Sequence, residues 1–570
     1  MSARTPTAPS GPAPAPDDVV RAVNGVLLPG FTGTQEPPAW LARAARDGLA
    51  GVVYFGHNTP DVETTARLSA RLREISPDLL VAIDEEGGDV SRLEAVTGSS
   101  IPGNAALGVV DDVAVTEQVG RALGRLLTAT GVDLDLAPDL DVNSDPDNPV
   151  IGVRSFGADP ALVARHGVAF VRGLHAGGAG ACGKHFPGHG ATDVDSHLAL
   201  PVVDASVEEL RARDLPPFAA TMSPDALPDA RLDAVMTAHV VVPALGPLPG
   251  TLEPAVGALV RELGFDGPVV TDALDMGAVT AFGAGDAGPA ADGPTTGIGE
   301  VAVRAIEAGA DLLCLGTTVG RDDEELFRQA QLALVAAVAA GRVTVDRLRE
   351  SAARTARARA VIRERQSASG VALAPQAALA ALDDLGRLGG DVAARAVRCA
   401  GPGPAALPGV PDVVDLRLRF DHAAGRTAQH VQRAIDDAFG PDVRHLRPAD
   451  EDAWAHALAA VRASARPLVV LTREPVPGSG ERARLDVLLG ERPDAVVLHT
   501  GFPGAVGQWF GATPGADADG TPAGGGTSPG AGPTVVVACG TGRANARAAV
   551  ALLRGAAADG VAPATGEGER

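Results

Sequence analysis

The chain has 570 residues, of which 45% are hydrophobic, and its formal net charge is −23 at pH 7. Such a charge argues against nucleic acid or an anionic membrane surface as a partner, because both need clustered positive charge. The first 17 residues lack the apolar core of a secretory signal, and no run of 18 or more apolar residues could cross a bilayer. We therefore expect a cytoplasmic protein with a small-molecule ligand. The length predicts two domains.

Residues 18–365, which follow a tail expected to be disordered (1–17), are predicted to form the first domain, and residues 20–320 repeat one rhythm. A short apolar run is followed by a longer stretch with helical spacing. Eight such repeats are typical of a (β/α)₈ TIM-type barrel, whose chemistry lies at the carboxyl ends of the strands. Polar residues follow several of the runs, which supports this interpretation. The expected strands lie within Ala22–Leu28, Gly51–Phe55, Leu79–Ile83, Val132–Ala137, Gly180–Gly183, Ala234–Ala238, Pro268–Thr271 and Ala310–Leu315.

A second, smaller α/β sandwich domain is predicted at residues 385–556, after a linker at 366–384. Its expected elements are strands within Val413–Leu418, Pro467–Thr472, Ala495–Thr500 and Thr534–Cys539, and a helix at Arg543–Leu553. Residues 511–533 are rich in Gly, Ala, Pro and Thr, which predicts a disordered loop. A similar loop is expected at 283–297, and 557–570 form a tail. The four cysteines are widely scattered, and we expect buried free thiols.

Lys184 is the only lysine among 48 basic residues. It heads the segment Lys184-His185-Phe186-Pro187-Gly188-His189-Gly190-Ala191-Thr192-Asp193-Val194-Asp195-Ser196-His197. A site shaped around a compact ammonium rejects the planar guanidinium of arginine. A lone lysine beside several histidines and carboxylates therefore indicates an active site rather than a stray surface residue.

Asp195 and His197 are candidates for an acid/base pair. In an extended segment residues i and i+2 point the same way, so the Asp195 carboxylate can hold one imidazole nitrogen of His197 and orient the other outward. Such a histidine can donate and recover a proton near neutral pH. A surface capping pair in a turn is the alternative that this triplet alone leaves open.

His185 and His189 have the spacing of a zinc pair on a helix, but Pro187 and Gly188 between them disfavour a helix. A zinc-dependent hydrolase that uses His185, His189 and His197 is therefore the weakest alternative. We expect no metal and no cofactor.

Asp272 directly follows an apolar run and would lie at the catalytic rim of a barrel. A carboxylate opposite a proton donor is the arrangement that cleaves glycosidic bonds with retention. Asp272 is the candidate nucleophile. The alternative is a carboxylate that only caps the next helix.

Four segments together resemble the bacterial β-N-acetylglucosaminidases of glycoside hydrolase family 3, of the NagZ type with a second domain found in Gram-positive bacteria. They are Ile83–Leu93, Asn148–Pro160, Lys184–His197 and Val270–Met276. The resemblance implies a retaining mechanism without metal, with Asp272 as nucleophile and Asp195 and His197 as acid/base pair. It implies sugar contacts from Asp84, Arg92, Arg154, Lys184 and His185. We add His239 and Met276 as candidate sugar-binding residues. Glu86, His189, Asp193 and His239 are conditional candidates, because the alternative for each is a purely structural role in shaping a loop.

Two positions depart from the commoner family pattern. Asp89 stands where many members have arginine. The change removes a positive charge near the expected substrate cleft, where it could bind a carboxylate of the substrate. Ala273 follows the nucleophile where a second aspartate is frequent. Neither change removes a catalytic group.

The sequence thus predicts an exo-acting enzyme that removes non-reducing terminal β-linked N-acetylglucosamine from muropeptide or chitin-derived fragments, as a monomer or homodimer. A phosphorylase that transfers the sugar of a β-N-acetylglucosaminide or β-glucoside to inorganic phosphate is the alternative. The same residues serve both reactions, because a neutral His197 tolerates phosphate. A catalytically silent sugar-binding protein would need neither Asp272 nor the Asp195–His197 pair.

Overall fold

The computed structural model describes residues 16–192, 200–280, 282, 297–316, 322–401, 405–417, 429–507 and 532–555. The expected tails and the loops at 283–297 and 511–533 lie wholly or largely outside these residues. Helix α1 begins at Pro16, just before the predicted end of the N-terminal tail. No helix in the described part of the chain is long and apolar enough to cross a membrane.

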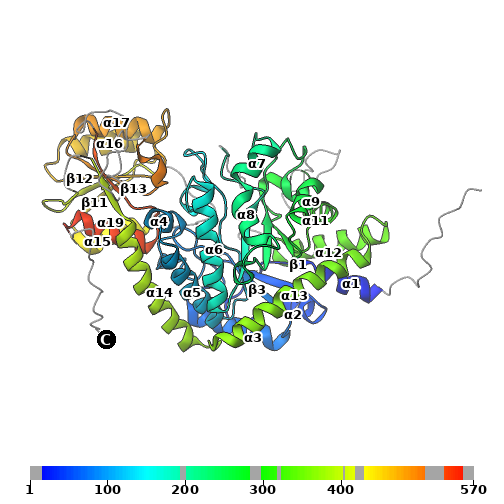
Figure 1. The fold of residues 1–570 in the computed structure, drawn as a ribbon. Helices are drawn as coiled ribbons and strands as arrows, with labels where there is room; N and C mark the ends of the chain where they lie inside the picture. Colours follow the sequence, from blue (N-terminus) through cyan, green and yellow to red (C-terminus); the bar gives the residue numbers. More distant parts are fainter. Residues whose placement is uncertain are drawn as a thin grey trace, which may run out of the picture.

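A curled parallel sheet forms the first part of the molecule (Figure 1). Strands β2 to β7 pair in chain order, and β1 pairs with β8. A bridge from Val270 to Leu312 joins β7 to β8, and Val53 N donates to Pro29 O beside β1. These contacts close the sheet into the predicted barrel. Its strands are β1 (Leu27–Leu28), β2 (Gly51–Tyr54), β3 (Leu80–Ile83), β4 (Leu134–Asp135), β5 (Gly180–Phe186), β6 (Ala234–Thr237), β7 (Val269–Thr271) and β8 (Leu313–Cys314).

Each of the eight predicted runs overlaps a strand, although residues 22–24 of the first run belong to α1 and β5 extends beyond the fifth run to Phe186. Helices surround the sheet and several begin at aspartate caps, as α3 does at Asp61 and α6 at Asp159, because a carboxylate accepts from unpaired N–H groups of the first turn. The helices of this part are α1 (Pro16–Asn24), α2 (Ala39–Arg46), α3 (Val62–Ile75), α4 (Asn104–Val110), α5 (Val113–Thr130), α6 (Pro160–Gly177), α7 (Val207–Arg213), α8 (Leu215–Met222), α9 (Pro254–Glu262), α10 (Gly277–Thr280), α11 (Ile298–Glu307), α12 (Asp323–Ala339) and α13 (Val345–Ser369).

Helix α13 crosses the amino-terminal end of the barrel. Its Ile362 packs with the strand residues that fill the barrel interior, and the helix also carries arginines that meet buried aspartates at the starts of strands. The pairs are Arg363–Asp133 at 2.8 Å before β4, Arg365–Asp233 at 2.7 Å before β6, and Arg347–Asp311 at 3.0 Å before β8. This end is therefore closed by structural contacts, which leaves the opposite end for chemistry.

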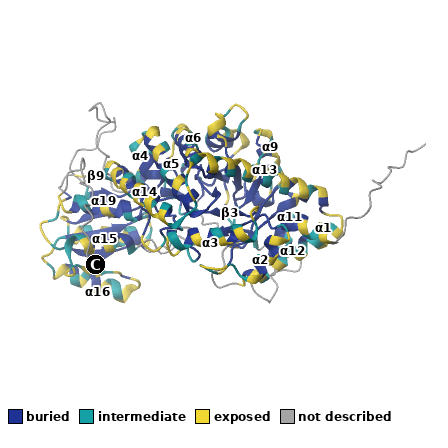
Figure 2. Ribbon diagram, turned by 90° about the horizontal axis from the view of Figure 1, so that it is seen from below, coloured by how far each residue is buried: buried dark blue, intermediate teal, exposed yellow. Residues whose placement is uncertain are grey.

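The second part is an α/β sandwich with the sheet order β11-β10-β12-β13-β14-β9. Its strands are β9 (Arg398–Ala400), β10 (Asp412–Asp415), β11 (Arg444–Leu446), β12 (Leu468–Thr472), β13 (Val496–His499) and β14 (Thr534–Val537). Its helices are α14 (Pro375–Ala396), α15 (Gln429–Phe439), α16 (Glu451–Arg462), α17 (Gly480–Glu491) and α19 (Arg543–Leu553). Apolar clusters lie on both faces of the sheet, so its central strands are dark in the burial view (Figure 2).

All four predicted strands of this part exist, but β9 and β11 were not predicted. Both lie at sheet edges, where most of their side chains are exposed. Their sequences therefore contain no continuous apolar run from which a strand could be predicted. Cys399 lies on β9 and is exposed, so its predicted burial was wrong; the other three cysteines are buried.

Residues 366–384 are mostly helical rather than an extended linker. Helical structure is interrupted only between Ser369, where α13 ends, and Pro375, where α14 begins. Helix α14 lies along α5 and α3 of the barrel and reaches α19 of the second part (Figure 1). The domain limits drawn from the sequence stay a prediction.

Candidate active site

Lys184 lies near the carboxyl end of β5, between two carboxylates from the segment that follows β3. Its Nζ donates to Asp84 Oδ1 at 2.7 Å and forms an ion pair with Glu86 Oε1 at 2.6 Å. The side chain is only 2% exposed. Burial alone would lower the pKa of this amine, but the charges of Asp84 and Glu86 outweigh burial and raise it. The only lysine of the chain is therefore a charged bridge inside the candidate site.

Glu86 joins Lys184 to Arg154. Arg154 donates from Nε and Nη2 to the two oxygens of Glu86 at 2.9 and 2.8 Å, and both side chains are nearly inaccessible. Burial alone would raise the pKa of Glu86, but the charges of Arg154 and Lys184 hold it well below the usual range. Asn104 accounts for part of Arg154's placement, because its amide donates to Arg154 O at 2.7 Å.

Arg92 faces Asp84 from the far end of the same loop, with Nη2 3.8 Å from Oδ2. The neighbouring Glu85 fixes this part of the loop, since its carboxylate accepts from the backbone N–H groups of Arg92 and Leu93 at 2.8 Å each. Burial raises the pKa of Glu85 to about 7. The loop therefore presents Asp84, Glu86 and Arg92 from a rigid base.

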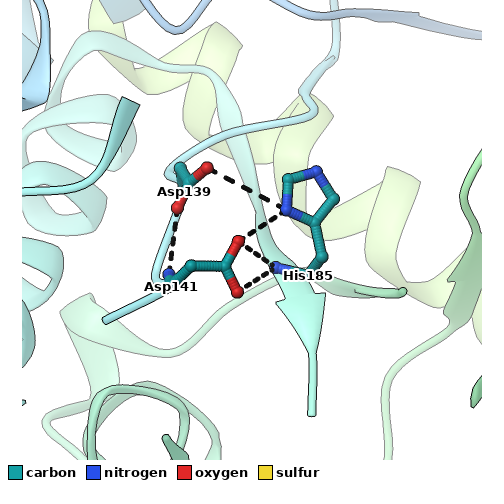
Figure 3. A group of neighbouring side chains, drawn as sticks. All are labelled: Asp139, Asp141 and His185. Atoms are coloured by element: carbon teal, nitrogen blue, oxygen red, sulfur yellow. Dashed lines mark hydrogen bonds and ion pairs between the residues drawn. The ribbon is translucent and has the colours of Figure 1, made fainter. Parts of the chain in front are cut away.

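His185 is oriented by two aspartates that follow β4 (Figure 3). Its Nδ1 donates to Asp141 Oδ2 at 2.7 Å, and Asp139 Oδ2 lies 3.9 Å from the same nitrogen. Its Nε2 faces Arg154 Nη2 at 3.3 Å, so Arg154 donates to it. Burial, with the nearby Arg154 charge, lowers the pKa of His185 to about 4, and burial raises the pKa of Asp141 to about 7. His185 is thus a neutral, fixed imidazole.

Asp139, Asp141 and His185 also have the spacing of a metal-binding group. One observation speaks against a cation there. Arg154 Nη2 lies 3.8 Å from Asp139 Oδ2, so a positive charge already faces this cluster. Burial and the Asp141 charge raise the pKa of Asp139 to about 8.

His189 lies beside His185, with ring centroids 6.0 Å apart. Its Nδ1 bonds Thr192 Oγ1 at 2.9 Å and its backbone N–H donates to Asp141 Oδ1 at 2.7 Å. Burial and the neighbouring His185 lower the pKa of His189 to about 3. His189 therefore shapes the loop that leaves β5.

Asp272 follows β7 directly and remains partly accessible. Its backbone N–H donates to Thr237 O at 3.3 Å, and Oδ1 accepts from Ala273 N at 2.7 Å. Its negative charge acts on His185 and His189 and favours their protonated forms. Asp272 thus lies on the same rim as the Lys184 network.

His239 and Met276 support the turn that carries Asp272. His239 is fully buried; its Nε2 donates to Ala273 O at 3.0 Å and its Nδ1 accepts from Thr251 Oγ1 at 2.8 Å. Met276 is 8% exposed, and its N–H donates to the same Ala273 oxygen at 3.1 Å. Both were predicted to bind sugar, and their geometry favours holding the turn that carries Asp272.

The structure brings together five of the predicted sugar-binding residues in one network, namely Asp84, Arg92, Arg154, Lys184 and His185. Asp193, Asp195 and His197 lie outside the described residues, so their roles stay predictions. Sequence reasoning did not assign a role to Asp139 and Asp141. The signal available was their place after the fourth predicted strand.

Comparison with known proteins decides the family. The model of the glycosyl hydrolase family 3 N-terminal domain matches residues 27–358. The chain belongs to glycosyl hydrolase family 3. The chain is 31% identical over 351 residues to Beta-hexosaminidase A of Pseudoalteromonas piscicida. The matched segment covers 57% of this chain and 55% of that protein. It is 37% identical over 265 residues to Beta-hexosaminidase of Pseudomonas aeruginosa, or 45% of this chain and 75% of that protein.

Solved structures of similar proteins agree with the fold. A β-N-acetylglucosaminidase from Paenibacillus sp. str. FPU-7 superposes with a TM-score of 0.73 at 29% identity, over 95% of this chain and 97% of that one. The β-glucoside phosphorylase BglX superposes with a TM-score of 0.66 at 18% identity, over 95% and 92%. The second likeness shows the fold alone.

Asp89, one of the two departures from the commoner family 3 pattern, does not face the cleft. Its carboxylate is fully buried against the second part of the chain, where Arg473 Nη1 and the Thr541 N–H both reach it at 2.5 Å. The expected position of Asp89 near the cleft was therefore wrong.

Proposed function

We propose that the protein is a retaining exo-β-N-acetylglucosaminidase that removes non-reducing terminal β-linked N-acetylglucosamine from muropeptide or chitin-derived fragments. One observation carries this proposal. Two carboxylates and two cations, Asp84, Glu86, Lys184 and Arg154, form a paired network on the rim that carries Asp272. The charges of these four groups cancel one another, which suits an uncharged polyol better than an ion.

The network matches the hydroxyl groups of a pyranose. A carboxylate such as Asp84 accepts from two hydroxyls, while Lys184 and Arg154 carry donors for a hydroxyl or an acetamido carbonyl. Because these groups are held by one another before a sugar arrives, little side-chain entropy is lost on binding. The partner that we propose is therefore a small β-glycoside.

Cleavage follows from Asp272 and the proposed acid/base pair. The Asp272 carboxylate attacks the anomeric carbon as the bond to the leaving oxygen breaks, and His197, oriented by Asp195, gives that oxygen its proton. The neutral His197 then takes a proton from water, whose oxygen displaces Asp272 from the sugar. Two inversions at one carbon retain the β configuration.

Phosphorolysis stays the alternative, with inorganic phosphate in place of water. Lys184 and Arg154 are each paired with carboxylates, so the positive charge of this network is already matched before phosphate arrives. This balance favours water as the acceptor. Residence in the cytoplasm and a monomeric or homodimeric state stay predictions.

The test is product analysis with 4-nitrophenyl N-acetyl-β-glucosaminide, with and without inorganic phosphate. We expect free sugar at a rate independent of phosphate, and loss of turnover in Asp272→Ala. Asp266→Ala is the matched control, because Asp266 is an exposed carboxylate just before β7. A sugar 1-phosphate that rises with phosphate would replace the hydrolase by the phosphorylase, and full turnover by the Asp272 variant would remove the proposed nucleophile.

A further inference from the structure

The loop after β3 carries Asp84, Glu86 and Arg92 of the candidate sugar site and also contacts the second part of the chain. Its tip is a tight turn, in which Gly87 N donates to Val90 O at 3.0 Å and Val90 N donates to Gly87 O at 3.1 Å. Asp89 lies in this turn and its side chain is fully buried. Glu86 and Arg92 lie just before and after the turn, so whatever holds Asp89 also holds them.

Asp89 enters the end of the second sheet at which open α/β sheets commonly bind ligands. Arg473 follows β12, and Thr541 follows β14 just before α19. Arg473 and the Thr541 N–H both bond the Asp89 carboxylate. The amino terminus of a helix and an arginine together favour an anion. Here that anion is a side chain of the barrel itself.

Two glycines allow this close approach. A Cβ added at Gly540 would lie 2.9 Å from Asp89 Oδ1, and one added at Gly542 would lie 2.7 Å from the Gly88 carbonyl oxygen. Any other residue at Gly542 would push on the backbone of the loop. The second part therefore fits the loop through its backbone as well as through charge.

A second contact holds the end of the same loop. Arg543 Nη2 donates to Glu94 Oε1 at 2.5 Å, and Ala544 N donates to Ser99 O at 3.1 Å. The Glu94 side chain is 3% exposed. The segment from Asp84 to Ser99 is thus fixed by the barrel at its start and by the second part at its tip and its end.

We propose that the second domain positions the sugar-binding loop, and that Asp89 and Arg473 are positioning residues that act through Glu86 and Arg92. The meaning of the loop as a sugar site rests on the proposed function. Arg473 is 13% exposed and also lies 3.8 Å from Glu474. Loss of the Asp89 contact would release the turn and displace the loop's donors and acceptors.

The test compares full-length variants of the contact. Arg473→Gln and Asp89→Asn each remove one charge, Arg473→Lys keeps the positive charge, and Gly542→Ala presses on the loop backbone. Arg395→Gln is the matched control, because Arg395 forms an exposed ion pair with Asp112 between α14 and the barrel, away from the loop. Steady-state kinetics with the aryl glycoside and hydrogen–deuterium exchange of residues 84–94 are measured for each.

We expect Arg473→Gln and Asp89→Asn to raise KM about tenfold with little change in kcat, because the loop binds ground state and transition state alike. Exchange in residues 84–94 should rise in both, and Arg473→Lys should lie near wild type. Arg395→Gln should change neither readout.

A wild-type KM and wild-type loop exchange in Arg473→Gln, equal to those of Arg395→Gln, would overturn the proposal. If Asp89→Asn does not fold, the two Arg473 variants decide alone. If the wild-type enzyme cleaves no N-acetylglucosaminide, the proposed function fails, and the exchange measurement still tests the positioning of the loop.

Discussion

Glu86→Gln is the substitution that most directly tests whether the charge network organises the site. Glu86 accepts two hydrogen bonds from Arg154 and forms an ion pair with Lys184. All three side chains are at most 6% exposed. Glutamine places an amide N–H₂ against one of these cations. Removing one member of a buried ion pair costs about 3–5 kcal/mol. We take the lower end, about 3 kcal/mol, because Lys184 keeps Asp84 and Arg154 keeps a distant Asp139.

The expected result is a roughly hundredfold loss in kcat/KM, because a displacement of donors by about 1 Å can cost that much. The assay is hydrolysis of the aryl glycoside, together with the apparent melting temperature, which should fall. Glu74→Gln is the control, since Glu74 forms an exposed ion pair with Arg71 on α3. A Glu86→Gln variant within about threefold of wild-type kcat/KM and with unchanged melting would refute this reasoning.

Three further results are expected. Burial raises the pKa of Glu481 to about 7. Above about pH 4.5 the unfolded chain releases this proton while the native state keeps it, so the free energy of unfolding falls as the pH rises from about 4.5 through 7. Glu481→Gln should therefore gain about 2.5 kcal/mol at pH 8 relative to pH 5 in denaturant titrations, and a gain independent of pH would contradict this. Ile362→Ala should lower stability by about 3 kcal/mol, whereas the exposed neighbour Val361→Ala should not; equal effects would contradict the role of α13 in the barrel. Dialysis against a chelator should leave hydrolysis unchanged; activity lost and restored by zinc would instead support a metal held by His185.

The barrel could be predicted because parallel strands buried on both faces are continuous apolar runs, such as Gly51–Tyr54 and Leu80–Ile83. The edge strands β9 and β11 could not, because their exposed side chains carry no such signal. Helix α14 begins at Pro375, inside the residues predicted as a linker, and packs between the two parts of the molecule, which the local sequence pattern does not show.

The positions of Asp84, Lys184 and Asp272 in the barrel could be predicted because each lies near the carboxyl end of a strand, and their roles stay predictions. Their partners were harder to predict, because these contacts join residues far apart in the chain. Asp141 and His185 are separated by 44 positions, and Asp89 and Arg473 by 384. No local pattern shows that a carboxylate on a barrel loop will meet an arginine in another sheet.

Chemical rescue of Asp272→Ala by azide tests the central claim most directly. If Asp272 is the nucleophile of a retaining enzyme, the variant should lose turnover of the aryl glycoside, and azide should restore it by entering the space that the carboxylate leaves. The product should be the α-glycosyl azide, because one displacement replaces two. Undiminished turnover without azide, or a β-glycosyl azide, would contradict the account.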